Sequence, residues 1–153
     1  MAAVVVLASV WTLPAQAASA PTLKIVTWSG KCLDVPGGSS ADRTPIQQWW
    51  CHGGANQRFD VVHVGGGLHE IRTSAGKCFD VEDSSHADGA RIVQFQCHGG
   101  ANQRFRQWKP SDRHYGFVTF VPSKSITITG GPADGARVVQ GPSNVTGHFL
   151  LSP

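Results

Sequence analysis

Short apolar segments separated by turn-forming residues run through most of this chain. Gly, Pro, Asn, Asp and Ser bound the segments, and none of them sustains a helical period, so the pattern predicts β-strands. We expect about twelve strands. They begin near Lys24, Cys32, Ile46, Arg58, Leu68, Cys78, Arg91, Phe105, Gly116, Ser125, Ala136 and His148.

The segments recur with a period of 46 residues. CHGGANQRF at 51–59 returns letter for letter at 97–105, which is 46 residues later (97 − 51). GKCLDV, beginning at Gly30, returns as GKCFDV from Gly76, and ADGARIVQ in the second copy returns as ADGARVVQ in a third. Self-similarity at a fixed spacing is typical of repeat architectures. The chain therefore contains three copies of one unit.

Three copies with four strands each predict the fold. Repeats of about 46 residues, near 22–67, 68–113 and 114–153, fill almost all of a single domain spanning 18–153. An all-β unit of this size with threefold repetition closes on itself and hides its edge strands. We therefore predict a pseudo-threefold β-trefoil.

The third copy departs from the other two. SKSITI at 123–128 stands in place of GKCFDV, both cysteines are absent, and Thr127 takes the position of Asp34 and Asp80. The counterpart of CHGGANQRF is SNVTGHFLL at 143–151. We expect any site shared by the first two copies to be absent from the third.

The first residues differ in character from the repeats. An uncharged apolar run from Ala2 to Leu13 is followed by Pro14 and an Ala-x-Ala sequence that ends at Ala17. This order is typical of a secretory signal peptide, and the run is too short to span a bilayer as a stable helix. We predict that residues 1–17 are removed and that the product is secreted, with no membrane span; a buried segment of the domain is the alternative.

The composition narrows the class of function. Charged residues make up 15% of the chain, and the formal net charge of +3 comes from scattered basic residues, which does not favour binding to nucleic acid. A hydrophobic content of 41% is that of a globular domain rather than a disordered chain.

Four cysteines divide evenly between the first two copies. Cys32 and Cys51 are 19 residues apart, as are Cys78 and Cys97 (51 − 32 and 97 − 78). An even number in a secreted chain favours disulfides, and pairing within each copy makes the two bridges repeat each other. Zinc is the rival interpretation, but no C-x-x-C pair is present, and we expect neither a metal nor a cofactor.

Each complete copy carries the same set of polar and aromatic side chains. An acidic acceptor, an amide and a flat apolar face suit a sugar, because vicinal hydroxyls offer paired donors and acceptors and ring C–H groups stack on aromatic rings. The set is Asp34, Trp49, His52, Asn56 and Gln57 in the first copy, and Asp80, Phe95, His98, Asn102 and Gln103 in the second.

The combination of C-[LF]-D-V, an aromatic residue two positions before the second Cys, and N-Q-x-[WF] resembles the ricin-B-type lectin repeat, also called carbohydrate-binding module family 13. CHGGANQRF is similar to versions found in secreted actinobacterial glycoside hydrolases and lectins. The resemblance covers all of 18–153. It implies a β-trefoil that binds mono-, oligo- or polysaccharides of the galactose or xylose type.

The resemblance also implies a role for each matching side chain. Asp34 would accept hydrogen bonds from sugar hydroxyls, and Trp49 would stack on the sugar ring. His52 would line the pocket, Asn56 would bond a ring hydroxyl, and Gln57 would brace the carboxylate. The second copy would use its matching residues in the same way.

Three positions near these pockets differ between the copies. Gln47 is a further polar position near the first pocket, and Val93 replaces it in the second. Asp83 stands at a family position that sometimes contacts sugar, where the first copy has Gly37. Phe95 is a less usual stacking platform than Trp or Tyr, so the second pocket is the weaker candidate.

Most of these residues also have a purely structural interpretation. Asp34 and Asp80 run into turn residues, although their place in an apolar segment argues against a turn role. The Asn residues could equally well form turns, and the His residues could be plain loop residues. The Gln residues are more typical of braces than of ligand contacts. We expect Phe59, Phe105 and Trp108 in the core.

No common catalytic motif appears in the sequence. H-E-x-x-H, G-x-S-x-G and P-loop patterns are absent, and Asp34 and Asp80 fall in separate repeats rather than forming a glycosidase pair. We expect a non-catalytic, monomeric binding protein, either a free lectin or a targeting module detached from a glycoside hydrolase. A trefoil-type protease inhibitor and a hydrolase of unusual type are the alternatives.

Overall fold

The computed structural model describes residues 22–142 and 147–153, which form thirteen strands and four single-turn 3-10 helices. The predicted signal peptide lies outside these residues. None of the helices described is long and apolar enough to cross a membrane.

The strands are β1 (Lys24–Val26), β2 (Cys32–Asp34), β3 (Thr44–Pro45), β4 (Gln47–Trp49), β5 (Phe59–His63), β6 (Leu68–Thr73), β7 (Cys78–Val81), β8 (Ile92–Phe95), β9 (Phe105–Trp108), β10 (His114–Thr119), β11 (Ser125–Thr129), β12 (Arg137–Gly141) and β13 (Phe149–Ser152). The helices are η1 (Pro36–Gly38), η2 (Ala55–Gln57), η3 (Glu82–Ser84) and η4 (Ala101–Gln103).

The all-β prediction is confirmed, with one difference in the number of strands. Each observed strand begins within two residues of a predicted start, but the segment near Ile46 is divided into β3 and β4. Pro45 has no N–H to donate to a ladder, and the chain changes partner at this point. Pro45 pairs with Val93 on β8, whereas Gln47 pairs with Asp34 on β2.

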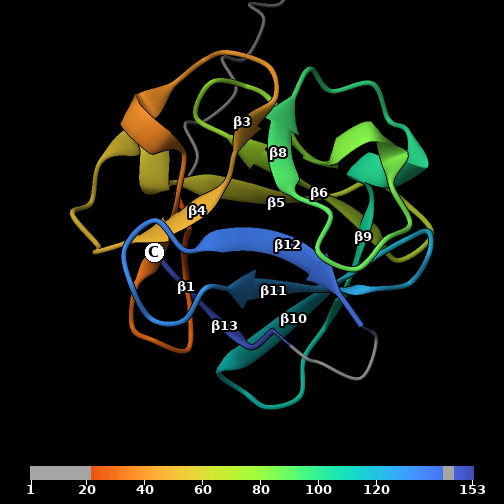
Figure 1. Ribbon diagram of the computed structural model, residues 1–153. Helices are drawn as coiled ribbons and strands as arrows, with labels where there is room; N and C mark the ends of the chain where they lie inside the picture. The colour runs from red at the N-terminus through yellow and green to blue at the C-terminus, as the bar shows by residue number, and fades with distance from the viewer. Residues whose placement is uncertain (1–21, 143–146) are drawn as a thin grey trace, which may run out of the picture.

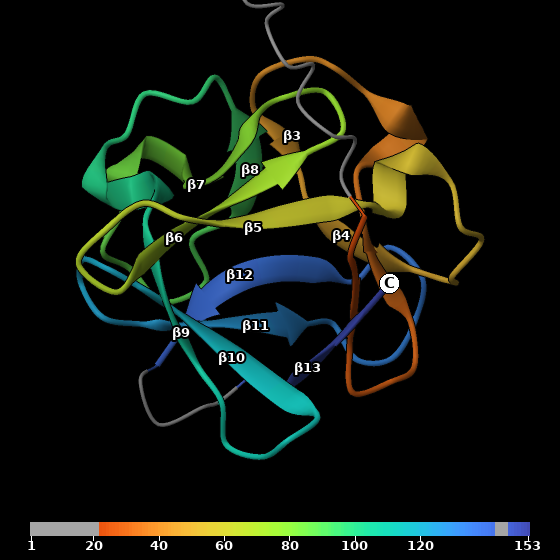
Figure 2. The same ribbon diagram turned by 180° about the vertical axis from the view of Figure 1, so that it is seen from behind.

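Six strands form a closed barrel. β1 pairs with β13, β13 with β10, β10 with β9, β9 with β6, and β6 with β5, all antiparallel. A bridge between Leu23 and Phe59 joins the β5 end of this ring back to the β1 end. Figure 2 shows β5, β6, β9 and β10 crossing this side of the molecule. Closure satisfies the strand edges that an open sheet would expose.

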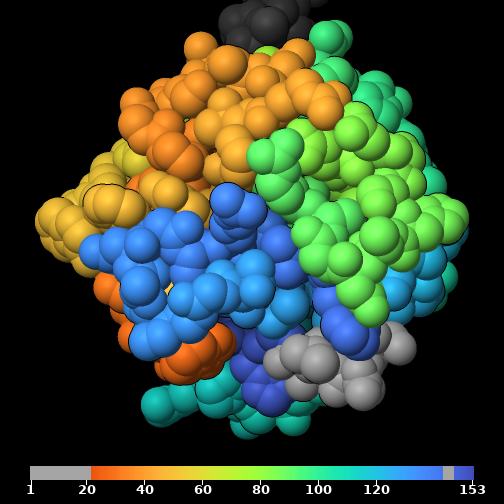
Figure 3. Space-filling view, in the orientation of Figure 1, coloured from red at the N-terminus to blue at the C-terminus, as the bar shows by residue number. Residues whose placement is uncertain are grey.

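Three hairpins, one from each repeat, cover one end of the barrel. They are β2–β4, β7–β8 and β11–β12. β12 pairs with β4, β3 pairs with β8, and Arg91 bridges Val139, so the hairpins meet around a central axis (Figure 1). The space-filling view shows orange, green and blue surfaces of the three repeats meeting on this face (Figure 3). The predicted pseudo-threefold trefoil is therefore confirmed.

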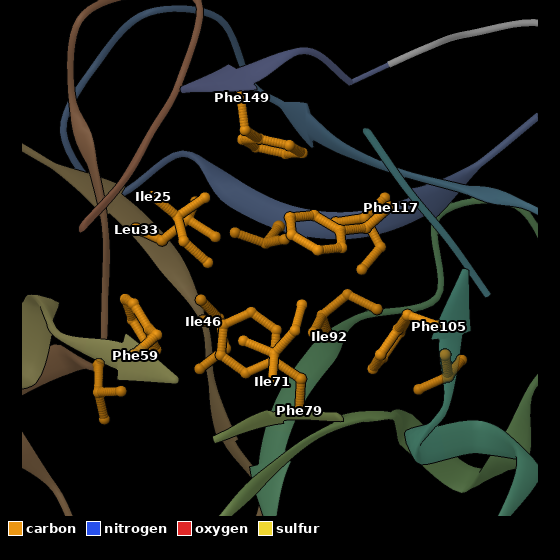
Figure 4. Close-up of a cluster of buried hydrophobic side chains, with 14 residues drawn as sticks. Ile25, Leu33, Ile46, Phe59, Ile71, Phe79, Ile92, Phe105, Phe117 and Phe149 are labelled. Atoms are coloured by element: carbon orange, nitrogen blue, oxygen red, sulfur yellow. The ribbon is translucent and has the colours of Figure 1, made fainter. Parts of the chain in front are cut away.

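The core is filled by equivalent side chains from the three repeats (Figure 4). Each of these side chains is no more than 2% exposed, and fully burying one contributes about 1.5–3 kcal/mol. The equivalent sets are Ile25, Ile71 and Phe117; Leu33, Phe79 and Ile126; Ile46, Ile92 and Val138; and Phe59, Phe105 and Phe149.

The expectation that Trp108 lies in the core is wrong. Trp108 is 37% exposed, and its ring contacts His148 with ring centroids 6.0 Å apart. Side chains alternate along β9, so that Phe105 faces the core and the residue three positions later faces outward. The indole lies over Gly116, its partner on β10, where an added Cβ would come within 2.3 Å of the ring nitrogen.

Three buried glutamines at equivalent positions tie each repeat to another. Each side-chain amide nitrogen donates to two backbone carbonyl oxygens of a loop in a different repeat, at 2.7–3.0 Å. These bonds tie the backbone of that loop to a buried amide. Gln48 binds Gly131 and Ala133, Gln94 binds Ser39 and Ala41, and Gln140 binds Ser85 and Ala87.

Three Lys–Asp ion pairs join the repeats in the same cyclic order. Each lysine follows the first hairpin turn of its repeat and reaches the loop before the last hairpin strand of another repeat. The pairs are Lys31 with Asp134, Lys77 with Asp42, and Lys124 with Asp88. The third repeat thus keeps its links to its neighbours, although it has lost the cysteines and the aspartate.

Candidate functional site

Asp34, the last residue of β2, is at the centre of the first pocket. Its side chain is 4% exposed, and three amide nitrogens donate to its carboxylate. Gln47 Nε2 donates to Oδ1 at 3.0 Å, while Asn56 Nδ2 and Gln57 Nε2 donate to Oδ2 at 2.9 and 3.0 Å. His52 Nε2 lies 3.4 Å from Oδ2. Such donors offset the cost of burying a carboxylate.

The histidine of each pocket is oriented by a local backbone bond. Gly54 N donates to His52 Nδ1 at 3.1 Å, so the neutral ring carries its proton on Nε2, the atom that faces Asp34. In the second repeat Gly100 N donates to His98 Nδ1 at the same distance, and the ring faces its own Asp. The second Gly of CHGG therefore has a role in the site as well as in the turn.

The glutamines of CHGGANQRF lie beneath the pockets rather than in them. Gln57 is fully buried; it donates to Asp34 and to the Trp50 carbonyl, and its Oε1 accepts from His52 N at 2.9 Å. Gln103 makes the matching bonds in the second repeat. Because they have no exposed surface, these side chains position the carboxylates and cannot contact a ligand directly.

The first pocket is open and uncharged at its edges. Its volume is about 600 Å³. Trp49 faces into it from β4, whereas Trp50 is 55% exposed outside the lining and meets His52 edge-on. The lining residues are Asp34, Pro36, Gly37, Gly38, Gln47, Trp49, His52 and Asn56. Every residue predicted for this pocket except the bracing Gln57 therefore lines one cavity.

The second pocket repeats this arrangement with fewer donors. Asp80 Oδ2 accepts from Gln103 Nε2 at 2.9 Å, and His98 Nε2 lies 3.4 Å away. Val93 stands where the first pocket has Gln47 and brings no donor. Burial raises the pKa of Asp80 above its ordinary value, and the bond from Gln103 offsets this only in part.

Charged residues surround the second pocket, which has a volume of about 160 Å³. Arg43, from the first repeat, reaches Asp83 at 2.9 Å and Glu82 at 3.1 Å. Arg91 holds Glu82 from the other side at 2.6 Å. The bond to Arg43 lowers the pKa of Asp83. The lining residues are Arg43, Asp80, Glu82, Asp83, Ser84, Val93, Phe95, His98 and Asn102.

Sequence reasoning missed Arg43 and Glu82. A signal for the arginine is present, because ADR at 41–43 aligns with ADG at 87–89 and at 133–135. The contact itself joins two repeats, so the motif of a single repeat does not contain it.

The third repeat presents neither an acid nor an aromatic at the matching positions. Thr127 pairs with Val139 as Asp34 pairs with Gln47, and Ser125 pairs with Gly141 as Cys32 pairs with Trp49. A hydroxyl replaces the carboxylate, and a hydrogen atom replaces the aromatic side chain. Part of the remaining stretch lies outside the described residues.

Both predicted disulfides are confirmed. Cys32 bonds Cys51 at 2.06 Å and Cys78 bonds Cys97 at 2.03 Å, with Cα atoms 5.1 Å apart in each pair. Glu70 lies near the second bridge at a spacing that a metal could use, but both thiolates there are consumed by the disulfide. The bridges hold the start of CHGGANQRF against β2 and β7.

Comparison with known proteins gives a consistent result. The family described as "Ricin-type beta-trefoil lectin domain" matches residues 21–143. The designed threefold-symmetric protein ThreeFoil is 32% identical with a TM-score of 0.82, over 86% of this chain and 97% of that one. The exo-β-1,3-galactanase 1,3Gal43A from Clostridium thermocellum is 30% identical with a TM-score of 0.80; the match covers 92% of this chain but only 31% of the galactanase chain. A Macrolepiota procera ricin B-like lectin, solved with lactose, shares the fold at 17% identity and a TM-score of 0.70, over 90% of this chain and 99% of that one.

Proposed function

This chain belongs to the ricin-type β-trefoil lectin domain family, and from that premise we propose that it binds sugars through two pockets, centred on Asp34 and Asp80. The described residues of the third repeat lack the acid and the aromatic and contribute no sugar pocket. The protein has no catalytic role of its own and acts as a lectin or as the targeting module of a glycoside hydrolase.

One observation carries this proposal. A buried carboxylate, held by a Gln amide and faced by His Nε2, occurs twice in the same geometry beside an aromatic ring. Both carboxylates are buried, which costs free energy that hydrogen bonds must offset, whereas a turn residue at the surface has no such cost. Sugar hydroxyls are ligands that donate to such a carboxylate, while the sugar ring stacks on Trp49 or Phe95.

Galactose-type sugars are the first ligands to test, followed by xylose-type sugars. The similarity to a galactanase chain supports a galactan or a terminal galactose, as well as the targeting role. Each pocket is shallow, so we expect weak binding to each sugar and stronger binding to polymers that engage both pockets.

We also propose that the protein is secreted. The two disulfides are consistent with an oxidising compartment. N-terminal sequencing of protein recovered from the culture medium should begin at Ala18; a mature chain that still begins at Met1 would rule out the signal peptide.

A glycan array tests the function, and an Asp34→Ala, Asp80→Ala double variant tests the sites. We expect galactose- or xylose-type glycans to bind the unaltered protein, and most of that signal to disappear in the folded double variant. Circular dichroism and disulfide content establish that the variant is folded. Unchanged binding by a folded double variant would show that the sites lie elsewhere, and a blank array would favour the protease-inhibitor alternative.

Hydrolysis is the rival function with some support in the structure. The second pocket gathers Asp80, Glu82 and Asp83, and burial raises the pKa of the first of these. Arg43 and Arg91 already hold the other two, so the pocket lacks an obvious free carboxylate partner for Asp80 among the residues that line it. Turnover assays on galactan and xylan should give no product, and product formation that depends on Asp80 would establish an enzyme.

A further inference from the structure

The two pockets differ at a pair of positions that meet at the pocket edge. In the second pocket these positions hold Asp83 and Arg43, joined by a hydrogen-bonded ion pair of 2.9 Å. In the first pocket the equivalent residues are Gly37 and Gly135. An added Cβ at Gly135 would lie 3.9 Å from the side chain of Trp49, so this glycine borders the first pocket as Arg43 borders the second.

Both charged residues occupy backbone conformations that favour glycine. Arg43 has φ +65°, where its counterparts Gly89 and Gly135 both have φ +83°. Asp83 has φ +56°, where its counterpart Gly37 has φ +61°. A left-handed conformation is costly for a residue with a Cβ.

The ion pair between these two residues is itself a weak source of stability. Arg43 and Asp83 have side chains that are 53% and 69% exposed, and an ion pair so exposed contributes little to folding. Two positions with left-handed backbone thus carry complementary charges that join one repeat to its neighbour at the edge of a pocket. Strained residues of this kind cluster at binding sites, where the geometry serves the ligand.

We propose that Arg43 is a specificity-determining residue of the second pocket and that, with Asp83, it forms a wall that restricts this pocket to free sugars and the ends of chains. An internal residue of a polysaccharide is linked to further sugars on both sides. A pocket that binds it must therefore have an exit on each side. The first pocket has glycine at both positions and a volume of about 600 Å³, whereas the Arg43–Asp83 pair narrows the edge of the second, whose volume is about 160 Å³. This assignment rests on the proposed sugar-binding function.

The wall also presents polar groups to the ligand. The exposed guanidinium N–H groups of Arg43 donate to sugar hydroxyls, and the carboxylate of Asp83 accepts from them. A terminal sugar has more free hydroxyls than an internal one, so these contacts favour the same class of ligand as the narrowed edge does.

The test isolates the second pocket with Trp49→Ala, which removes the stacking platform of the first pocket but keeps its buried carboxylate network. Calorimetry then compares galactose with galactan, and xylose with xylan, at equal concentrations of sugar residues. We expect the Trp49→Ala protein to bind the free sugar with about tenfold higher affinity than the polymer. Adding Arg43→Gly should remove most of this difference by strengthening polymer binding, and Asp83→Gly should act in the same direction.

The reverse experiment transfers the wall to the first pocket. In a Phe95→Ala background, Gly37→Asp with Gly135→Arg should turn an open pocket into one that prefers the free sugar. Because these positions already accept charged residues in the second pocket, their left-handed backbone does not prevent folding, which circular dichroism checks.

The outcomes separate the two proposals. If the Trp49→Ala protein binds free sugar and Arg43→Gly leaves the ratio of free sugar to polymer unchanged, the wall is overturned while sugar binding stands. If neither protein binds any of the four probes and the unaltered protein binds with a single site, the second pocket is not a sugar site and its proposed function is overturned too.

Discussion

Asp34 and Asp80 occupy equivalent positions, but one neighbouring substitution changes their chemistry. Gln47 donates to the first carboxylate, and Val93 leaves the second without that donor. The second carboxylate therefore keeps more of its hydrogen-bonding capacity for a ligand, but its charge is less well stabilised. The same motif therefore holds the two carboxylates with different sets of donors.

We predict that, as the solution is acidified, the second pocket loses sugar binding at a higher pH than a pocket with an ordinary Asp would. Burial raises the pKa of Asp80 above its ordinary 3.8, so this carboxyl gains a proton, and stops acting as a carboxylate acceptor, before an ordinary Asp would. Titrating galactose binding of the Trp49→Ala protein against pH measures this. A midpoint at or below 3.8 would contradict it.

The same shift has a defined consequence for folding. Because the folded pKa of Asp80 is raised, the native state binds more protons than the unfolded state between the ordinary and the raised values. Its contribution to the free energy of unfolding therefore decreases as pH rises through that window. Denaturant unfolding of the Asp80→Asn variant should lack this slope, and an unchanged slope would assign it to another group.

Gly54 should be intolerant of a side chain for reasons of function. A Cβ there would lie 2.7 Å from Asn56 Oδ1 and 2.8 Å from the His52 ring, so Gly54→Ala should displace both side chains and weaken binding by the first pocket. Both displaced groups are side-chain atoms near the surface, so the fold should survive. Gly100→Ala is the matched control, since it should weaken only the second pocket; equal affinity of the Gly54→Ala protein and the unaltered protein would be the contrary result.

Much of the first pocket could be predicted at the level of residues. Carboxylate, platform and amide recur at fixed spacing, and a repeated spacing is visible in sequence. Arg43 could not be found in this way, because its partner Asp83 lies in another repeat and the contact depends on how the repeats pack. The orientation of Trp108 was misjudged because its hydrophobicity favoured burial while strand alternation placed it outside.

At the level of elements, the strands are short and their positions are set by the turns between them. Turn residues bracket the apolar segments so closely that the strand starts could be predicted within two residues. The glutamines before the pocket aromatics could not be assigned in the same way. A Gln in an apolar segment gives no sign that its amide will reach a loop in another repeat.

We expect Gln94→Ala to cost about 1–3 kcal/mol of stability, because it removes a buried amide that donates to the carbonyls of Ser39 and Ala41 in another repeat. Gln48→Ala should cost more, since its Oε1 also accepts from the hydroxyls of Thr27 and Ser29. Urea unfolding measures both variants. Gln96→Ala, at an exposed position, is the control; equal effects at all three positions would contradict the proposed link between repeats.

Each disulfide should stabilise the fold by a similar amount. A bridge that closes a loop of this length contributes roughly 3 kcal/mol by constraining the unfolded chain. Replacing Cys32 and Cys51 with Ser, or Cys78 and Cys97 with Ser, should therefore give two proteins of comparable stability in urea. A loss confined to one pair would mean that strain or residual structure, not loop closure, dominates.

For the whole molecule, the links between repeats occur three times, whereas the acid-centred pocket occurs twice among the described residues. The third repeat keeps its Gln140 and Lys124 contacts with the second, but Thr127 and Gly141 replace the acid and the platform. The trefoil needs all three repeats to close its barrel and complete its core, whereas each pocket depends mainly on its own hairpin. Loss of one pocket therefore leaves the fold intact.

The number of sugars bound by one chain tests this account most directly. Titration calorimetry or NMR with galactose, or with xylose if the array favours it, should give two sites in the unaltered protein. It should give one site in each of the folded Asp34→Ala and Asp80→Ala variants, and none in the double variant. Three sites, or sites that persist in the folded double variant, would contradict the claim that these two carboxylates define the binding pockets.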